Sequence, residues 1–404
     1  RRRGARHRPA AGAAGRATAR RAPVLTDAGG RHAADLMRTH IVDPSAFTPP
    51  YDHALASALA RAGAEVELIT SRFPYGAVPE PDGYAVRELF YRRSFGPPGS
   101  RARQAGKLLT HVPDMVRYRA VAQAADVVHF QWLAVQAVDR WLLPRVPVVL
   151  TAHDLLPREP RPGQAWAQRR LYDAVDAIVV HSAYGRDLLV SGLGVDAGKV
   201  RVIHHGAFKH LTVQANEVPL PPELRSVDAP VVLFFGLLRP YKGLDTLLEA
   251  WRGISPGAEL WVVGRPRMPL EPLLRAAPPG VRFIARFVSD AELPAFFRRA
   301  DVVALPYSRT ERFDFSGVLA TALAFGKPTV ISDVGGFSEV AAAGAARLVA
   351  PDDPGALRAE IEALLNDQQA REGLAWGALT AAKGVYSWET AAHETLALYR
   401  ELVP

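Results

Sequence analysis

Residues 301–339 read DVVALPYSRTERFDFSGVLATALAFGKPTVISDVGGFSE, and this stretch decides the fold class. Two short apolar runs enclose a polar loop and a helix-like segment, which is the pattern of one strand–helix–strand unit of a parallel sheet. The predicted elements are a strand at 301–305, a loop at 306–315, a helix at 316–325 and a strand at 329–332. The chain is therefore predicted to be α/β.

The start of the predicted helix is the first candidate binding site. In a doubly wound sheet, ligands bind beyond the carboxyl ends of the strands. A helix N-terminus at that edge presents unpaired N–H groups and the positive end of the helix dipole. Ser316, Gly317 and Val318 are therefore predicted to form a phosphate seat.

A second predicted strand end carries two cations. Residues 231–251 read VVLFFGLLRPYKGLDTLLEAW, in which a strand stops before Gly236 and a helix follows the loop that holds Arg239 and Lys242. Glycine lets the backbone approach a ligand, and two cations at a strand end suit a diphosphate. A lysine before a helix is more often a solvated charge. The loop becomes a binding candidate because, in a doubly wound sheet, it can open on the same crevice as Ser316.

The composition limits the class of protein. With 404 residues, 49% of them apolar, the chain is long enough for two domains with their own cores. Its formal charge is +8, but residues 1–22 hold eight Arg and no acid, so the rest has 41 basic and 41 acidic residues. This neutral body disfavours a nucleic-acid partner. The absence of Cys excludes disulfides and Cys-zinc sites and fits a reducing cytoplasm, where we expect the protein to act.

Residues 1–36 are predicted to lie outside the fold, as a disordered arm or an over-extended start. They include the acid-free, Arg-rich segment, and the first methionine, Met37, stands directly before the first strand-like run. No stretch of the chain reaches the roughly 18 apolar residues that a membrane span needs.

The rest of the chain alternates between short apolar strands and helical segments, which predicts two parallel sheets. The predicted strands are 39–42, 65–70, 126–130, 146–151, 177–181, 200–203, 231–235, 260–263 and 281–284, and the predicted helices are 52–62, 132–143, 163–175, 185–191, 244–251, 268–276 and 290–300. Ser289 and Glu292 give the last of these helices a capping-box start. A Pro-rich segment near 213–230 is predicted to be a linker, and two sheets in one chain place a ligand in the cleft between them.

Several motifs in this order resemble family 4 of the retaining glycosyltransferases, which have the GT-B fold. The motifs are FFGLLRPYKGLDTLLEAW, WVVGRP, FVSDAELPAFFRRADVVALPYS and SGVLATALAFGKPTVISDVGG in the second half, with TAHDLLP, DAIVVHS and VIHHGAF in the first and YSWETAAHETLALYREL at the end. The resemblance covers the chain from about Met37. It implies two Rossmann-like doubly wound domains that face a central cleft: an acceptor domain at 37–212, a nucleotide-sugar domain at 231–385, and a closing helix at 386–404 that packs back on the first domain.

The resemblance also implies roles for individual residues. Lys242 matches the lysine that holds the donor diphosphate, and His153 matches the histidine beside the reacting sugar. The backbone N–H groups of Gly317, Val318 and Leu319 match those that hold the diphosphate. Further donor-side residues are implied by the same motifs: Gly236, Arg239, Gly264, Ser316 and Glu339.

This sequence departs from the family at three places. The family has two glutamates with seven residues between them, one near the transferred sugar and one on the ribose, and those positions are Phe313 and Thr321 here. Asp314 is therefore a candidate substitute, and a branch of the family that dispenses with both carboxylates is the alternative. The Arg of the family's Gly-Arg motif is Leu237 here, and Arg239 is expected to supply the missing cation.

The third departure is near the first strand. Where the family has a Gly-Gly loop, this chain reads TPPYDH, so Tyr51, Asp52 and His53 are expected to face the cleft on the acceptor side. Without the resemblance, His153 reads as a hydrogen-bonded structural histidine, and Glu339 as a cap of the following helix.

The implied reaction is transfer of a sugar with retention of the anomeric configuration, assisted by His153, Lys242, Arg239 and Asp314. Its main demand is to stabilise negative charge on the departing diphosphate, which fixed cations and N–H groups do well. We expect no metal and no cofactor, because the region has no carboxylate pair with metal-ligand spacing. The alternative is a protein that binds the nucleotide sugar without turnover.

The segment 91–119 is basic and has interleaved apolar residues, which permits an amphipathic helix at the inner face of a membrane. The ordinary alternative is a helix that packs on the sheet with a solvated basic face. The acceptor is expected to be lipid-linked or a small molecule. A dehydrogenase is disfavoured, because GLGVDAG at 192–198 lacks the Gly-x-Gly-x-x-Gly spacing and follows a predicted helix.

Overall fold

The computed structural model describes residues 36–94, 96, 97, 100–133, 135–157, 162–255 and 257–403. Residues 37–404 form one compact unit. The expectation of a disordered arm at residues 1–36 lies outside the described residues, apart from Leu36.

The N-terminal sheet has seven parallel strands in the order β3-β2-β1-β4-β5-β6-β7. Its strands are β1 (Arg38–Asp43), β2 (Glu65–Thr70), β3 (Ala85–Glu88), β4 (Val127–Phe130), β5 (Val148–Thr151), β6 (Ala177–Val180) and β7 (Val200–Val202). Strands β4, β5 and β6 are buried along their whole length, because helices cover both faces of a parallel sheet.

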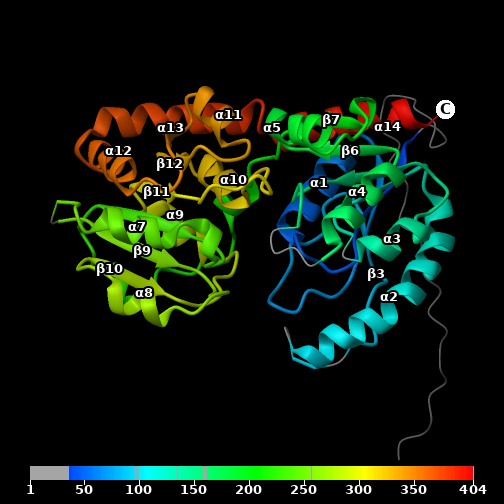
Figure 1. Ribbon diagram of the computed structural model, residues 1–404, viewed down its shortest axis with the longest axis horizontal. Coiled ribbons are helices and arrows are strands. Elements are labelled where there is room, and N and C mark those ends of the chain that lie inside the picture. Colours follow the sequence, from blue (N-terminus) through cyan, green and yellow to red (C-terminus); the bar gives the residue numbers. More distant parts are fainter. Residues whose placement is uncertain are drawn as a thin grey trace, which may run out of the picture. The chain divides into compact units, whose positions relative to one another are not determined.

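The C-terminal sheet has six parallel strands in the order β10-β9-β8-β11-β12-β13. Its strands are β8 (Val231–Phe235), β9 (Glu259–Val263), β10 (Val281–Ile284), β11 (Val302–Leu305), β12 (Thr329–Ser332) and β13 (Arg347–Val349). In Figure 1 the strands of the first sheet are coloured from blue to green and those of the second from light green to orange.

Most helices connect successive parallel strands, and α12, α13 and α14 follow the last strand. The bounds of the helices are α1 (Pro49–Arg61), α2 (Arg101–Val121), α3 (Gln136–Leu142), α4 (Gln164–Ala174), α5 (Ala183–Asp187), α6 (Pro222–Arg225), α7 (Leu244–Trp251), α8 (Glu271–Ala276), α9 (Leu293–Arg299), α10 (Gly317–Ala324), α11 (Phe337–Ala342), α12 (Pro354–Asn366), α13 (Gln368–Lys383) and α14 (Trp388–Leu402).

Both sheets have the strand order of a doubly wound Rossmann fold, so the predicted fold class is confirmed. In this order the chain leaves the first strand in one direction and later returns to its other side. The point of reversal lies between β1 and β4 in one sheet and between β8 and β11 in the other. Ligand crevices are therefore expected beyond the carboxyl ends of these four strands.

Some elements differ from the prediction. Strand β3 is an edge strand whose four residues are all exposed, so it carries no apolar run. Helix α9 begins at Leu293 and not at residue 290; the Glu292 carboxylate accepts the Ser289 N–H at 3.0 Å one turn earlier. The segment predicted as a linker contains the short helix α6.

The last helix, α14, packs against α1 of the N-terminal half, as Figure 1 also shows. The Tyr399 hydroxyl lies 2.7 Å from His129 Nδ1 on β4. The ring of Trp388 meets that of Tyr51 at a centroid distance of 4.9 Å. The core of the N-terminal sheet is therefore completed by the end of the chain.

Candidate active site

The loop after β8 buries Lys242 beside the end of its own strand. Lys242 is 6% exposed, and its ammonium lies 5.2 Å from the centroid of the Tyr307 ring. Gly236 has φ +110°, and a Cβ there would lie 2.8 Å from Lys242 Nζ. The glycine therefore provides the conformation and the space that place this cation.

This loop is tied to the loop after β11. The Ser308 N–H donates to the Tyr241 carbonyl at 2.9 Å. Gly243 has φ +67°, and a Cβ there would lie 1.8 Å from the Pro306 carbonyl oxygen. Only glycine allows this approach, which brings the loops after β8 and β11 together.

The N-terminus of α10 lies at the same crevice. Ser316 caps the helix by accepting the Val318 N–H at 3.2 Å, and its hydroxyl lies 2.9 Å from that of Tyr307. Of the three N–H groups that the family resemblance implies, that of Val318 is thus engaged by the cap. The N–H groups of Gly317 and Leu319 are the other donors of this first turn.

These groups surround a cavity of about 290 Å³, which we call the small cavity. Its wall contains Gly236, Leu237, Tyr241, Lys242, Asp290, Tyr307, Phe313, Ser316, Gly317, Val318 and Thr321. A buried cation and a helix N-terminus on one wall make it suited to an anionic group such as a diphosphate.

The positions at which the family has glutamates lie on the same wall. Phe313 and Thr321 both line the small cavity. The Thr321 hydroxyl donates to the Gly317 carbonyl one turn earlier at 2.8 Å. The wall therefore presents an aromatic ring and a hydroxyl bonded to its own helix in place of two carboxylates.

Asp314 does not line the small cavity. It is fully buried, and it accepts the His181 N–H at 2.5 Å and the Ser182 hydroxyl. Burial raises its pKa to about 7, against the lowering effect of the Ser182 bond. Neighbouring residues of an extended segment point in opposite directions, so Phe313 on the cavity wall turns Asp314 toward the end of β6. Asp314 in this position is a tie between two loops and does not replace the missing carboxylate.

Glu339 makes a second tie of this kind. Its carboxylate accepts the Ala183 N–H at 2.8 Å and the Tyr184 N–H at 3.4 Å, at the start of α5, and lies 3.3 Å from His204 Nε2. Glu339 therefore caps α5 in the N-terminal half of the chain, and not α11, the helix to which it belongs. Glu339 does not line the small cavity.

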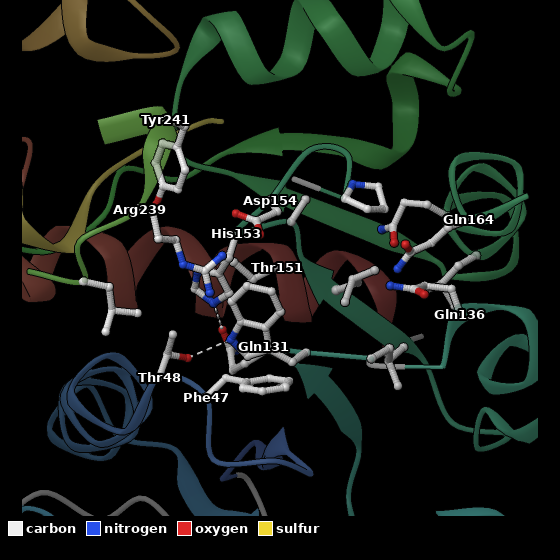
Figure 2. A pocket seen from close by; sticks show the side chains of 18 residues that line it. Phe47, Thr48, Gln131, Gln136, Thr151, His153, Asp154, Gln164, Arg239 and Tyr241 are labelled. Carbon is white, nitrogen blue, oxygen red and sulfur yellow. Dashed lines mark hydrogen bonds between the residues drawn. The ribbon is translucent and has the colours of Figure 1, made fainter. Parts of the chain in front are cut away.

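His153 belongs to a second, larger cavity of about 660 Å³ at the reversal point of the N-terminal sheet (Figure 2). It follows β5, and its Nε2 lies 3.2 Å from the Gln131 carbonyl oxygen Oε1. Its ring stacks on Trp132 at a centroid distance of 5.0 Å. The Trp132 indole N–H donates to Thr48 Oγ1 at 2.9 Å, so residues after β1, β4 and β5 hold one another in place.

The two cavities share wall residues and separate the two loop cations. Leu237 and Tyr241 line both cavities, whereas Arg239 lines the large cavity with His153 and Lys242 lines the small one. Figure 2 shows Arg239 and Tyr241 beside His153. A ligand that spans both cavities would therefore meet Lys242 at one end and His153 at the other.

Tyr51, Asp52 and His53 do not line either cavity. All three are buried in the first turns of α1. The Tyr51 ring packs on that of His153 at 4.6 Å, and His53 Nδ1 lies 2.5 Å from the Tyr84 hydroxyl. Burial, together with the neighbouring carboxylate of Asp43, raises the pKa of Asp52 well above its ordinary value. The expectation that these side chains face the cleft is therefore wrong. They are buried in the protein, and Tyr51 packs against His153 of the large cavity.

Gly264 acts on the small cavity through the backbone. It follows β9 with φ +147°, and a Cβ there would lie 1.7 Å from the Gly236 carbonyl oxygen. Gly264 does not line the small cavity, but its lack of a side chain lets the ends of β8 and β9 approach.

A Gly264→Ala substitution is expected to lower the free energy of unfolding by about 1–3 kcal/mol, the usual cost of overpacking, and to displace the Gly236 loop. Urea unfolding followed by circular dichroism measures this. Gly63→Ala is the matched control, because Gly63 also has positive φ (+96°) but no atom within 4 Å of the added methyl. Equal losses in the two variants would show that backbone conformation, and not the contact with Gly236, is what matters.

Asp290 and Gln131 are among the wall residues that were not predicted from the sequence. Asp290 follows β10 and brings a carboxylate to the small cavity, where burial raises its pKa. Gln131 directly follows β4 and is fully buried on the wall of the large cavity. Only their position in the sequence could have indicated them, because both follow the carboxyl end of a parallel strand.

In the part of the chain that the structure describes, no group of three or more His, Cys, Asp or Glu side chains is placed to hold a metal ion. Among the same residues, no helix has the length and apolar character to cross a membrane.

Comparison with known proteins identifies the class of protein. Residues 51–207 match the profile described as Glycosyltransferase Family 4, and residues 229–367 match the one described as Glycosyl transferases group 1. The chain is 31% identical over 382 residues to the D-inositol 3-phosphate glycosyltransferase of Xylanimonas cellulosilytica, covering 86% of this chain and 89% of that protein. It is 29% identical over 387 residues to that of Jonesia denitrificans, covering 85% and 88%. The chain belongs to glycosyltransferase family 4.

Solved structures confirm the GT-B fold. Sucrose-phosphate synthase from Thermosynechococcus elongatus superposes with a TM-score of 0.70 at 20% identity, covering 91% of this chain and 99% of that one. Anabaena HepE in complex with UDP and glucose superposes with a TM-score of 0.69 at 19% identity, covering 91% and 100%. The protein is thus a glycosyltransferase with two Rossmann-like domains.

Proposed function

We propose that this glycosyltransferase moves a sugar from a nucleotide-sugar donor to a small polyhydroxylated acceptor, with retention of the anomeric configuration and without a metal. The observation that carries the proposal is the junction of the two cavities. The small cavity offers Lys242 and the N-terminus of α10 to a diphosphate, and the large cavity places His153 where the sugar would follow.

The charge arrangement supports departure of a diphosphate. Lys242 is buried and held at a fixed place by Gly236 and Tyr307, so its charge needs no rearrangement during the reaction. Ser316 fixes the first turn of α10, which adds the positive end of the helix dipole. With these groups, charge on the leaving group is stabilised without a cation from solution.

Retention requires that the acceptor oxygen attack C1 of the sugar from the side that the diphosphate leaves. The His153 ring can donate from Nε2 to Gln131 Oε1, which lies 3.2 Å away and fixes the position of the ring. In this role it orients a hydroxyl of the sugar and does not serve as a nucleophile. No carboxylate nucleophile is available from Asp314, whose oxygens are engaged at the end of β6.

Incubation with a panel of UDP-, GDP- and ADP-sugars tests the proposal. We expect one donor to bind, to be hydrolysed slowly without acceptor, and to give a product with the donor's anomeric configuration by proton NMR. The rate is expected to be the same with and without EDTA. Inversion, or loss of activity in EDTA, would contradict the mechanism. Binding without any turnover would favour a nucleotide-sugar-binding protein.

The face of α2 also favours peripheral contact with an anionic membrane. Leu108 and Leu109 are 63% and 79% exposed, and Val112 and Val116 lie on the same side of the helix. Met115 is buried next to this stripe, and His111 lies 2.5 Å from Asp139 and anchors the helix. Arg101 and Arg117 are exposed on the same helix, and Arg92 and Arg93 are exposed in the turn before it. Apolar side chains between basic ones suit a surface of anionic lipid.

We expect the protein to sediment with vesicles of phosphatidylglycerol but not with those of phosphatidylcholine, and the bound fraction to fall as salt is raised. A double variant, Leu108→Ser with Leu109→Ser, should lose most of this binding. Leu379→Ser, which removes a leucine that is 41% exposed on α13, is the control and should bind as the parent does. Equal sedimentation with the two lipids would rule out the contact.

A further inference from the structure

The large cavity has a wall that differs in chemistry from an anion site. The rings of Phe47, Trp132 and Tyr241 line it. Four glutamines and two threonines line it as well: Gln131, Gln136, Gln164, Gln168, Thr48 and Thr151. Among its described wall residues, Arg239 is the only Lys or Arg. Figure 2 shows several of these amides and rings around the same space. Amides and hydroxyls pair with neutral hydroxyl groups, and aromatic faces pack on the apolar faces of sugar rings.

Gln131 holds a hydrogen-bond donor that no protein atom satisfies. Its side chain is fully buried, its Oε1 faces His153 at 3.2 Å, and its Nε2 has no partner among the described residues. A buried amide N–H without a partner is unfavourable, so such a group is expected to meet a ligand atom. Because Gln131 lines the large cavity, that atom belongs to what the cavity holds.

The helix that begins next to this cavity is closed to anions. Helix α1 starts with Pro49 and Pro50, which have no N–H, and the next two N–H groups, of Tyr51 and Asp52, both donate to the Thr48 carbonyl at 2.9 and 3.0 Å. The first turn therefore has no donor left for a phosphate.

We propose that the large cavity takes an uncharged polyhydroxylated ring as acceptor, a cyclitol or monosaccharide without a phosphate group. This rests on the proposed glycosyl transfer and specifies its acceptor. It differs from the acceptor in the names of the curated relatives, D-inositol 3-phosphate. In the transfer, the acceptor oxygen forms the new bond to C1 of the sugar as the C1–O bond to the diphosphate breaks, and the hydroxyl proton passes to the departing diphosphate oxygen.

Matched acceptor pairs test the proposal: myo-inositol against its 3-phosphate, and glucose against glucose 6-phosphate. Each is titrated by ligand-observed NMR into protein saturated with the nucleoside diphosphate that the donor panel selects, and transfer is measured with the corresponding donor. We expect the neutral member of a pair to bind at least about tenfold more tightly and to be the better acceptor. Tighter binding of the phosphorylated members, or binding of no member, would overturn the proposal. Donor hydrolysis in the absence of acceptor reports separately on the proposed function.

Variants of Gln131 test whether the acceptor ring lies next to this side chain in the large cavity. Gln131→Glu keeps an oxygen that faces His153 and removes the N–H donor, so we expect KM for the acceptor to rise roughly threefold to tenfold. Gln131→Leu should act in the same direction. Gln369→Leu, at an exposed site on α13, is the control for a change of Gln to Leu. An unchanged acceptor KM in both Gln131 variants would show that this amide does not meet the acceptor.

Discussion

Replacing Lys242 by Ala is expected to reduce turnover about 10²–10³-fold, the loss seen when one fixed donor to a developing negative charge is removed. Lys242 is the one buried lysine side chain among the described residues of the small cavity, and its ammonium is positioned by the Tyr307 ring and the bare backbone of Gly236. The neutral side chain leaves α10 as the main source of positive charge for the diphosphate. The loss should appear in kcat as well as in kcat/KM, because charge on the diphosphate is greatest in the transition state.

The control for this experiment is Lys383→Ala, which removes an exposed lysine at the end of α13. It should retain full activity, and both variants should keep the parent's circular dichroism. A Gly236→Ala variant provides a second route to the same result, because its methyl would lie 2.8 Å from Lys242 Nζ and would displace the ammonium without removing it. A loss of less than tenfold in Lys242→Ala would mean that the N-terminus of α10 alone carries the diphosphate.

Acid is expected to destabilise the protein through three buried histidines: His129 on β4, His181 directly after β6, and His205 after β7. Burial, and in addition the nearby His181, lowers the pKa of His205 to about 3 from the ordinary value of 6.5. Burial also lowers the pKa of His129 to about 3 and that of His181 to about 4. Between pH 6.5 and these values the unfolded chain binds protons that the folded protein does not, so stability falls as the pH falls.

A His205→Phe variant isolates one such group. Phenylalanine keeps an aromatic ring against Phe315 and Trp388, which His205 contacts at 5.4 and 5.7 Å between centroids. Its free energy of unfolding should fall less than the parent's between pH 7.5 and pH 4, by about 3 kcal/mol, since one pKa unit corresponds to about 1.4 kcal/mol. Asp314, whose burial raises its pKa to about 7, has the opposite effect, because its stabilising contribution is lost as the pH rises toward 7. It is present in both proteins and cancels in the comparison.

Urea midpoints at the two pH values measure this difference. His393→Gln is the control, because His393 lies on an exposed position of α14 and its removal reports any general effect of losing an imidazole. If the parent and His205→Phe lose the same stability on acidification, then His205 is protonated in the folded protein and the buried cluster does not set the acid limit.

Much of the fold could be predicted from local patterns. Strand β8, strand β12 and helix α7 have the predicted bounds, because each is a short apolar run or an amphipathic segment bounded by Gly, Pro or polar residues. Strand β3 could not be predicted, since an exposed edge strand has no apolar signal and is held by pairing with β2. Which helix covers which sheet also depends on distant contacts, as the packing of α14 on α1 shows.

Site residues could be predicted where strand order alone places their loops together. They could be predicted less well where the role of a residue depends on the direction of its side chain. Lys242 and Ser316 follow strands β8 and β11, and strand order alone brings such loops together. Asp314 is one residue from a family glutamate position, but that single step reverses the side chain. Gln131 could not be recognised from the sequence. Its proposed role depends on a buried side-chain N–H group without a hydrogen-bond partner, which only the structure shows.

The place of α14 has a consequence for how the protein is made. His129 and Tyr399 form a hydrogen bond across 270 residues of chain. A growing polypeptide emerges N-terminal part first, so β1 to β7 leave the ribosome while the helix that closes over Tyr51 and His129 has yet to be translated. During that interval the first sheet has an uncovered apolar face. We therefore expect an N-terminal domain expressed alone to be more stable when α14 is fused to its end.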